Sequence, residues 1–130
     1  MIKLINDNYG VVIYARQEGS ISIEQMLDGL RFMAENTSLP RQLRIIEDSR
    51  KAKVTFTHND IELIVNAINE MMVKYESVRH AVLLDSPINT VFAMLFNTKR
   101  LSVAYRLEVF ASVEGALSWL NTDLKSLPED

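Results

Sequence analysis

The chain has no cysteine among its 130 residues. That absence excludes structural disulfides, a thiolate nucleophile and cysteine-ligated metals. An excess of basic residues is missing as well, since 14 Lys and Arg stand against 17 Asp and Glu, for a net charge of −3. Because nucleic-acid-binding domains normally carry a clustered basic face, we expect no nucleic-acid partner.

Long apolar runs are also absent from the chain. No stretch approaches the roughly 20 apolar residues of a membrane-spanning helix, so we expect no membrane span. The opening residues MIKLINDNYG turn polar too early for a secretory signal, and we therefore expect a cytoplasmic location. With 48% hydrophobic and 24% charged residues, the composition is that of one globular domain over 1–130. Only its tail, 126–130, is expected to fray.

Short apolar runs alternate with helical patterns along the chain. Helical spacing of apolar residues predicts helices that begin near Ser22, Thr57, Ser86 and Ser112. Strand patterns occur at 2–5, 11–15, 43–47, 80–84 and 106–110, with turn residues joining the first two in a hairpin. The order β-β-α-β-α-β-α-β-α predicts an α/β fold with a mixed five-stranded sheet, parallel apart from its opening antiparallel hairpin.

Three segments carry a resemblance to a known fold: LRIIEDSR, VRHAVLLDSPINTVFAMLF and YRLEVFASVEGALSWL. The first resembles the third strand of the SpoIIAA-like superfamily, which contains the STAS domains and related bacterial proteins of unassigned role. The other two resemble a strand and helix, and the closing strand and helix, of the uncharacterised branch. The resemblance spans nearly the whole chain and implies a STAS-like module, although none of these motifs identifies an activity.

Thr57 is the first candidate functional residue. STAS domains that antagonise anti-sigma factors carry a phosphorylatable Ser or Thr at the start of the helix after the third strand. In this chain that position falls on FTHN, 56–59, where only Thr57 supplies a hydroxyl and the acidic residue and glycine of the motif are missing. The alternative is that Thr57 caps the helix, with Asp60 at the third helical position, which would contribute about 1 kcal/mol.

Polar residues that follow the expected strands form a second candidate site. Ligands of open α/β sheets bind outside the carboxyl ends of the parallel strands. Helix N-termini in such a crevice favour anions, so a phosphate or carboxylate can bind there. The alternative is that the aspartates only end their strands by bonding to loop N–H groups. The residues in question are Asp48, Ser49, Arg50, Asp85 and Ser86.

The segment VFAMLF, 91–96, is apolar nearly all the way round its expected helix. A one-sided surface helix would carry polar residues on its far face. The segment therefore packs in the core, forms a homodimer interface, or walls an apolar pocket for a small molecule or lipid. The residues available for an interface are Val91, Phe92, Leu95 and Phe96.

The remaining residues show no catalytic or metal-binding pattern. The two histidines, His58 and His80, lack the spacing of a zinc site or of a nucleophile with its base. We therefore expect no metal, no cofactor and no catalytic residue. The prediction is a non-enzymatic interaction module that binds a protein partner or a second copy of itself, with a lipid or small-molecule carrier as the alternative.

Overall fold

The computed structural model describes residues 1–55, 57–85 and 102–128. The helix expected from Ser86 onward, with Val91, Phe92, Leu95 and Phe96, lies outside these residues. The elements are β1 (Ile2–Asp7), β2 (Gly10–Ile21), α1 (Ile23–Glu35), β3 (Gln42–Val54), the 3-10 turn η1 (His58–Asp60), α2 (Ile61–Met72), β4 (Ser77–Leu83), β5 (Tyr105–Phe110) and α4 (Val113–Trp119).

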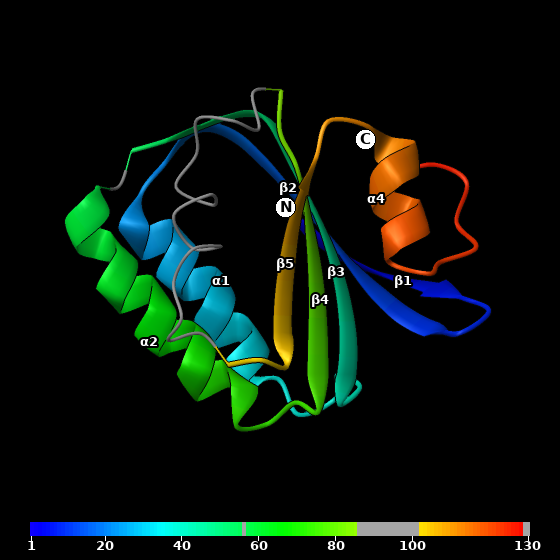
Figure 1. Ribbon diagram of the computed structural model, residues 1–130, viewed down its shortest axis with the longest axis horizontal. Helices are drawn as coiled ribbons and strands as arrows, with labels where there is room; N and C mark the ends of the chain where they lie inside the picture. The colour runs from blue at the N-terminus through cyan, green and yellow to red at the C-terminus, as the bar shows by residue number, and fades with distance from the viewer. Residues whose placement is uncertain (56, 86–101, 129–130) are drawn as a thin grey trace.

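The strands form one five-stranded sheet in the order β1-β2-β3-β4-β5. β1 runs antiparallel to β2, and every other neighbouring pair is parallel. This arrangement confirms the predicted α/β fold with a mixed sheet and an opening hairpin. Figure 1 shows α1 and α2 on one side of the sheet and α4 on the other. Within the described residues, no helix is long and apolar enough to cross a membrane.

Alternating side chains of the strands supply a core on each face of the sheet. The interior strand β4 is buried from Val78 to Leu83 except for half-buried Arg79, as expected of a strand covered on both faces. The core under α1 and α2 includes Ile13, Leu43, Ile45, Ile64, Ile68 and Met71. The core under α4 includes Val12, Tyr14, Ile46, Leu83, Leu117 and Leu120, and Leu127 of the C-terminal tail packs against it.

β2 and β3 are longer than their sequence patterns predicted. The prediction ended them at 15 and 47, whereas they pair in parallel as far as Ile21 and Val54. A bulge shifts the register between Arg16 and Glu18, and Gly19 takes a positive φ of 73° inside the strand. The predicted ends were wrong because the polar residues that extend β2 pair through their backbone with those that extend β3. This pairing between distant segments overrides the local turn propensity.

The starts of two helices follow the predicted capping chemistry. Gln25 N–H donates to the Ser22 hydroxyl at 3.3 Å, and Ser22 N–H donates to Gln25 Oε1 at 2.7 Å, which completes a capping box. At α4, Gly115 N–H donates to the Ser112 hydroxyl at 3.1 Å. These local bonds were readable from the sequence because both partners lie within one turn.

The C-terminal end of α4 is held by residues distant in sequence. Asn121 takes a φ of 58° while Thr122 N–H donates to the Leu117 carbonyl, a Schellman ending with asparagine in the left-handed position. Arg79 then donates to the Trp119 carbonyl at 2.8 Å, and Arg44 donates to the Asn121 carbonyl at 3.5 Å. Both cations therefore face the negative end of the helix dipole.

A bidentate ion pair joins the first hairpin to β3. Arg44 donates to both carboxylate oxygens of Asp7, at 2.7 and 2.8 Å, and the Asp7 side chain has no exposed surface. The Thr122 hydroxyl donates to the same carboxylate at 2.6 Å. The Arg44 hydrogen bond, supported by those of Thr122 and Tyr9, holds the pKa of Asp7 far below its usual value despite burial. One carboxylate thus ties together β1, β3 and the segment after α4.

Replacement of Asp7 should destabilise the chain strongly. We expect Asp7→Asn to lower the free energy of unfolding by about 3 kcal/mol, because it leaves the Arg44 charge without its partner. The exposed pair Asp28–Arg31 is the matched control, and Asp28→Asn should cost no more than ~0.5 kcal/mol. Urea unfolding of both variants measures the difference, and equal losses would contradict the assigned role of Asp7.

Candidate functional site

A buried polar network crosses three strands on the face covered by α1 and α2. His80 Nε2 lies 3.0 Å from Glu47 Oε1, and His80 Nδ1 lies 2.6 Å from the Tyr105 hydroxyl. The Ser49 hydroxyl donates to the other Glu47 oxygen at 2.6 Å. Each of these four residues is less than 9% exposed. The network therefore sets an acid, an imidazole and a phenol in series inside the core.

Electrostatics decide where the protons of this network lie. Burial raises the pKa of Glu47, but the hydrogen bond and attraction from His80 and the hydrogen bond from Ser49 outweigh it, and the pKa is lowered. Burial and the nearby Glu47 charge raise the pKa of the Tyr105 phenol, which stays protonated. His80 Nε2–H therefore donates to an ionised Glu47, and the Tyr105 hydroxyl can donate to Nδ1 or accept from it.

All members of the network are satisfied by one another. Among the described residues, no buried side-chain nitrogen or oxygen lacks a hydrogen-bond partner. A saturated network inside a core adds rigidity and selects one packing arrangement. The sequence pointed to His80 only as a strand residue and missed Glu47 and Tyr105 as its partners. The available signal was Glu47, a charged residue at the inward position of the alternating strand LRIIE.

The predicted crevice residues are only partly brought together. Asp48, Ser49 and Arg50 lie within β3 and not in a loop after it, which corrects the prediction. Asp48 pairs with Leu83, so these residues do lie level with the carboxyl end of β4. Ser49 instead bonds to Glu47 on the opposite face of the strand. Exposed Asp85 interacts favourably with Arg50, and Ser86 lies outside the described residues.

Arg50, the cation of the predicted anion site, is already paired. Its Nε and Nη2 donate to the two oxygens of Asp48 at 2.9 and 2.8 Å, and its backbone N–H donates to the same carboxylate. The Arg50 hydrogen bond lowers the pKa of Asp48, and the Asp48 hydrogen bond raises that of Arg50. A cavity of about 370 Å³ opens beside this pair, lined by Tyr14, Arg16, Glu18, Leu127 and Pro128 as well.

Thr57 precedes η1 and is exposed. Its backbone N–H donates to the Asp60 carboxylate at 2.9 Å, while Asp60 N–H donates to the Thr57 carbonyl. The long helix expected from residue 58 therefore opens as a 3-10 turn, and α2 begins at Ile61 with Asp60 as its N-cap residue. The bond from Thr57 N–H to Asp60 is one half of the predicted capping box, and the other half, a bond to the Thr57 hydroxyl, is not among the bonds described.

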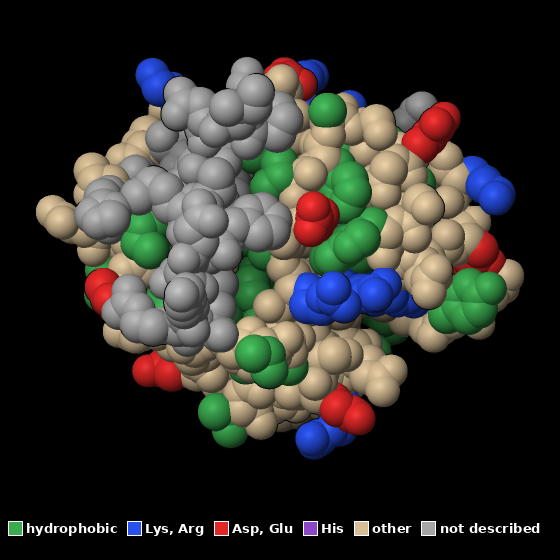
Figure 2. All heavy atoms as spheres, viewed as in Figure 1, with side chains coloured by type: hydrophobic (Ala, Val, Ile, Leu, Met, Phe, Trp, Pro, Cys, Tyr) green, Lys and Arg blue, Asp and Glu red, His purple; other side chains and the backbone are tan. Residues whose placement is uncertain are grey.

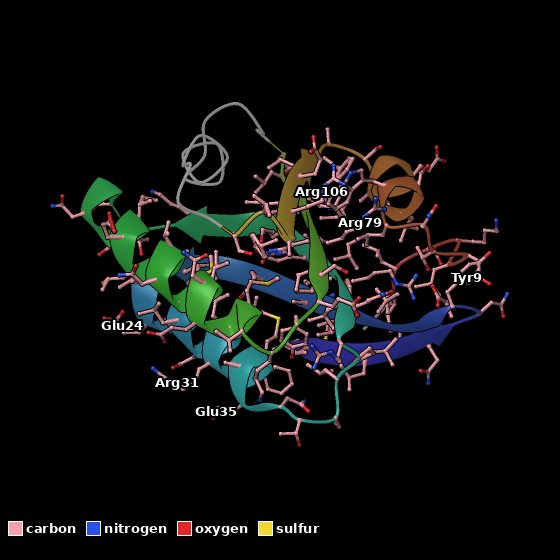
Figure 3. All side chains as sticks on the ribbon, turned by 60° about the horizontal axis from the view of Figure 1, so that its bottom comes forward. Tyr9, Glu24, Arg31, Glu35, Arg79 and Arg106 are labelled. Atoms are coloured by element: carbon pink, nitrogen blue, oxygen red, sulfur yellow. The ribbon has the colours of Figure 1, made fainter. Side chains whose placement is uncertain are left out.

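Three arginines form a row across neighbouring strands on the α4 face. The register places Arg44 of β3 beside Arg79 of β4, and Arg79 beside Arg106 of β5. Figure 2 shows one short band of Lys and Arg side chains on the exposed surface, and Figure 3 shows Arg79 and Arg106 on the side of α4. Arg79 also lies over the Trp119 ring at 5.4 Å, a cation–π contact. Arg44 and Arg79 are thus held by contacts within the chain, with Asp7 and with Trp119, whereas Arg106 is exposed.

Comparisons with known proteins bear on the fold. No protein-family model matches the chain, and no curated protein matches it. Among solved structures, an uncharacterised protein of the DUF3478 family from Shewanella loihica PV-4, with a SpoIIAA-like fold, superimposes with a TM-score of 0.58. The two chains are 16% identical, and the match covers 92% of each. The chain has a SpoIIAA-like fold.

This SpoIIAA-like fold confirms the resemblance found in the sequence, and at 16% identity the likeness shows the fold alone. In the part of the chain that the structure describes, no group of three or more His, Asp or Glu side chains is placed to hold a metal ion. Of the ionisable groups described above, Asp7 and Glu47 are paired across strands, whereas Asp48 is paired with Arg50 of its own strand.

Replacement of Glu47 should change how stability depends on pH. Since folding lowers the pKa of Glu47 from about 4.5, its contribution is present above that pH and is lost as the pH falls below it. We expect Glu47→Gln to cost about 2–3 kcal/mol at neutral pH and to lose this part of the acid dependence. Tyr105→Phe, which keeps the Glu47 partners, should cost about 1 kcal/mol and retain the dependence. Urea unfolding from pH 3 to 7 compares the three proteins, and parallel wild-type and Glu47→Gln curves would refute the assignment.

The turn before α2 offers a second test. We expect Asp60→Ala to cost about 1 kcal/mol, as for loss of a capping side chain, and Thr57→Ala to cost about half of that or less. The reason is that, in the bonds described at this turn, Asp60 takes part through its side chain and Thr57 through its backbone N–H and carbonyl. Thermal or urea unfolding measures both losses, and a larger cost for Thr57→Ala would restore its hydroxyl as the cap.

Proposed function

We propose that this SpoIIAA-like chain is a non-catalytic module that binds protein by adding a strand to the free edge of β1. The observation that carries the proposal is the combination of unpaired backbone and exposed apolar side chains along that strand. β1 is the first strand of the sheet order, and among the strands that the structure describes it has β2 as its only neighbour.

The outward-facing backbone groups of β1 follow from its pairing. Arg16 N–H donates to the Met1 carbonyl at 2.9 Å, and Met1 N donates to the Arg16 carbonyl at 3.2 Å, so these two form a hydrogen-bonded pair. Antiparallel ladders alternate such pairs with non-bonded ones. Ile2, Leu4 and Asn6 therefore turn their N–H and C=O groups away from β2, toward the free edge.

Apolar side chains are concentrated on the same hairpin. Ile2 is 46% exposed, Leu4 is 52% exposed and Tyr9 at the turn is 74% exposed. Figure 3 shows Tyr9 at the outer end of the hairpin. Exposed apolar side chains beside an open strand edge suit an extended peptide, which gains main-chain hydrogen bonds and side-chain contacts together.

The interior of the chain supports the non-catalytic half of the proposal. Glu47, His80 and Tyr105 are bonded to one another, and Asp48 is bonded to Arg50. Glu47, His80 and Tyr105 are each less than 9% exposed, so a substrate could not reach them without opening the core. Ile2, Leu4 and Tyr9 of the first hairpin are exposed as they stand.

Peptide selection tests the proposal directly. Random heptapeptides displayed on phage should yield ligands with alternating apolar residues when selected on the wild-type chain. Leu4→Pro removes one outward N–H without touching the β1–β2 ladder, and proline is tolerated on an edge strand. We expect Leu4→Pro to weaken the binding of the selected peptides about tenfold or more. One hydrogen bond to the peptide is lost, and a neighbouring hydrogen bond is poorly aligned.

Two controls keep this experiment interpretable. Leu63→Lys alters a residue of similar exposure on α2, 51% against 52%, and should leave peptide binding unchanged. Circular dichroism verifies that Leu4→Pro is folded. Peptides that bind Leu4→Pro as well as wild type would contradict the proposed edge. A lipid retained by the folded chain in native mass spectrometry would favour the carrier alternative instead.

A further inference from the structure

We infer that one occupant of this edge is a second copy of the chain, joined by antiparallel pairing of β1 with β1 about a two-fold axis at Leu4. This inference rests on the proposed function, because it uses the same free edge. It adds the identity of the partner, the direction of the added strand and its register.

The register follows from which residues face outward. A residue of β1 can form a hydrogen-bonded pair with the other copy only if its backbone N–H and C=O groups point to the free edge. Ile2, Leu4 and Asn6 are the residues of β1 that meet this condition. With the axis at Leu4, Leu4 lies opposite Leu4 of the other copy. Ile2 of each copy then lies opposite Asn6 of the other. All three residues of each copy are then paired.

Other two-fold registers use the strand less well. An axis at Lys3 places two ammonium groups directly opposite each other, which is destabilising, and leaves Asn6 without a partner. An axis at Ile5 sets Ile2 against Asn8, which lies in the turn between β1 and β2. The axis at Leu4 avoids both penalties.

The side chains agree with this register. Ile2 and Leu4 lie on one face of β1, where both are about half exposed, and the pairing would bring the apolar groups of the two copies together. None of the outward residues is charged or a proline, the usual devices that protect a strand edge. At the other border of the sheet, β5 carries exposed Arg106 and Glu108. β1 is the less protected border in that it carries one exposed charged side chain, Lys3, against two on β5.

The size of the contact predicts its strength. A single pair of six-residue strands is small beside the roughly 800 Å² per partner of a stable interface. We therefore expect a reversible dimer that forms at high protein concentration and dissociates on dilution.

Cysteine cross-linking tests the register, because the chain has no cysteine of its own. Residues of a hydrogen-bonded antiparallel pair have Cα atoms about 5.5 Å apart, within the range of a disulfide. Mild oxidation of Leu4→Cys at high concentration should give a cross-linked dimer. Ile2→Cys alone should stay monomeric, whereas Ile2→Cys mixed with Asn6→Cys should form a disulfide between copies. Leu63→Cys, equally exposed on α2, measures random cross-linking.

Sedimentation equilibrium provides a second measurement without cysteine. The mean mass of wild type should rise with concentration toward twice that of the monomer, and so should that of Leu63→Lys. Leu4→Lys should remain a monomer because two ammonium groups would meet at the axis. The inference is overturned if Leu4→Cys cross-links no faster than Leu63→Cys, or if wild type stays monomeric throughout.

These outcomes separate the inference from the proposed function. A monomeric chain that still binds strand-like peptides, and loses them with Leu4→Pro, overturns self-pairing and leaves the interaction module in place. Failure of both experiments removes β1 as a docking edge altogether.

Discussion

The bidentate contact between Asp7 and Arg44 is the interaction on which the rest of the structure depends. Asp7 ends β1, Arg44 lies near the start of β3, and the Thr122 hydroxyl reaches the same carboxylate from the segment after α4. β1 is joined to β2 along its whole length, and the Asp7–Arg44 pair adds a side-chain contact that reaches across β2 to β3. The pair therefore fixes the end of β1 against the sheet.

The two faces of β3 carry polar groups that are used in the same way. On one face Glu47 binds His80 and Ser49, and on the other Asp48 binds Arg50. In both cases a carboxylate keeps its charge because hydrogen-bond donors compensate for lost water. The groups with chemical potential are thus held within the sheet, while its first hairpin displays backbone and apolar surface. This division motivates the proposal that the chain binds through an edge.

Sequence reasoning succeeded where the partners were close in the chain. The helix starts at Ser22 and Ser112 and the opening hairpin follow from local chemistry, and the structure has them. Apolar periodicity also predicted a strand at 80–84, which the structure has as Ser77–Leu83. Reasoning was less successful at 48–54, where polar residues that read as a loop continue β3 because β2 pairs with them. It also placed Ser49 with Asp48 in one crevice, whereas successive residues of a strand point to opposite faces.

The sequence by itself determined the class of fold, the element order and the positions of the apolar stripes, because these depend on periodicity and on contacts within a few residues. Only the tertiary structure decided the register between strands. Glu47, His80 and Tyr105 belong to three strands and meet on a diagonal, with Ile45 level with His80 and Val78 level with Tyr105. A shift of one residue in any strand would turn its side chain to the other face. The register between strands is therefore what joins Glu47, His80 and Tyr105 in one buried network.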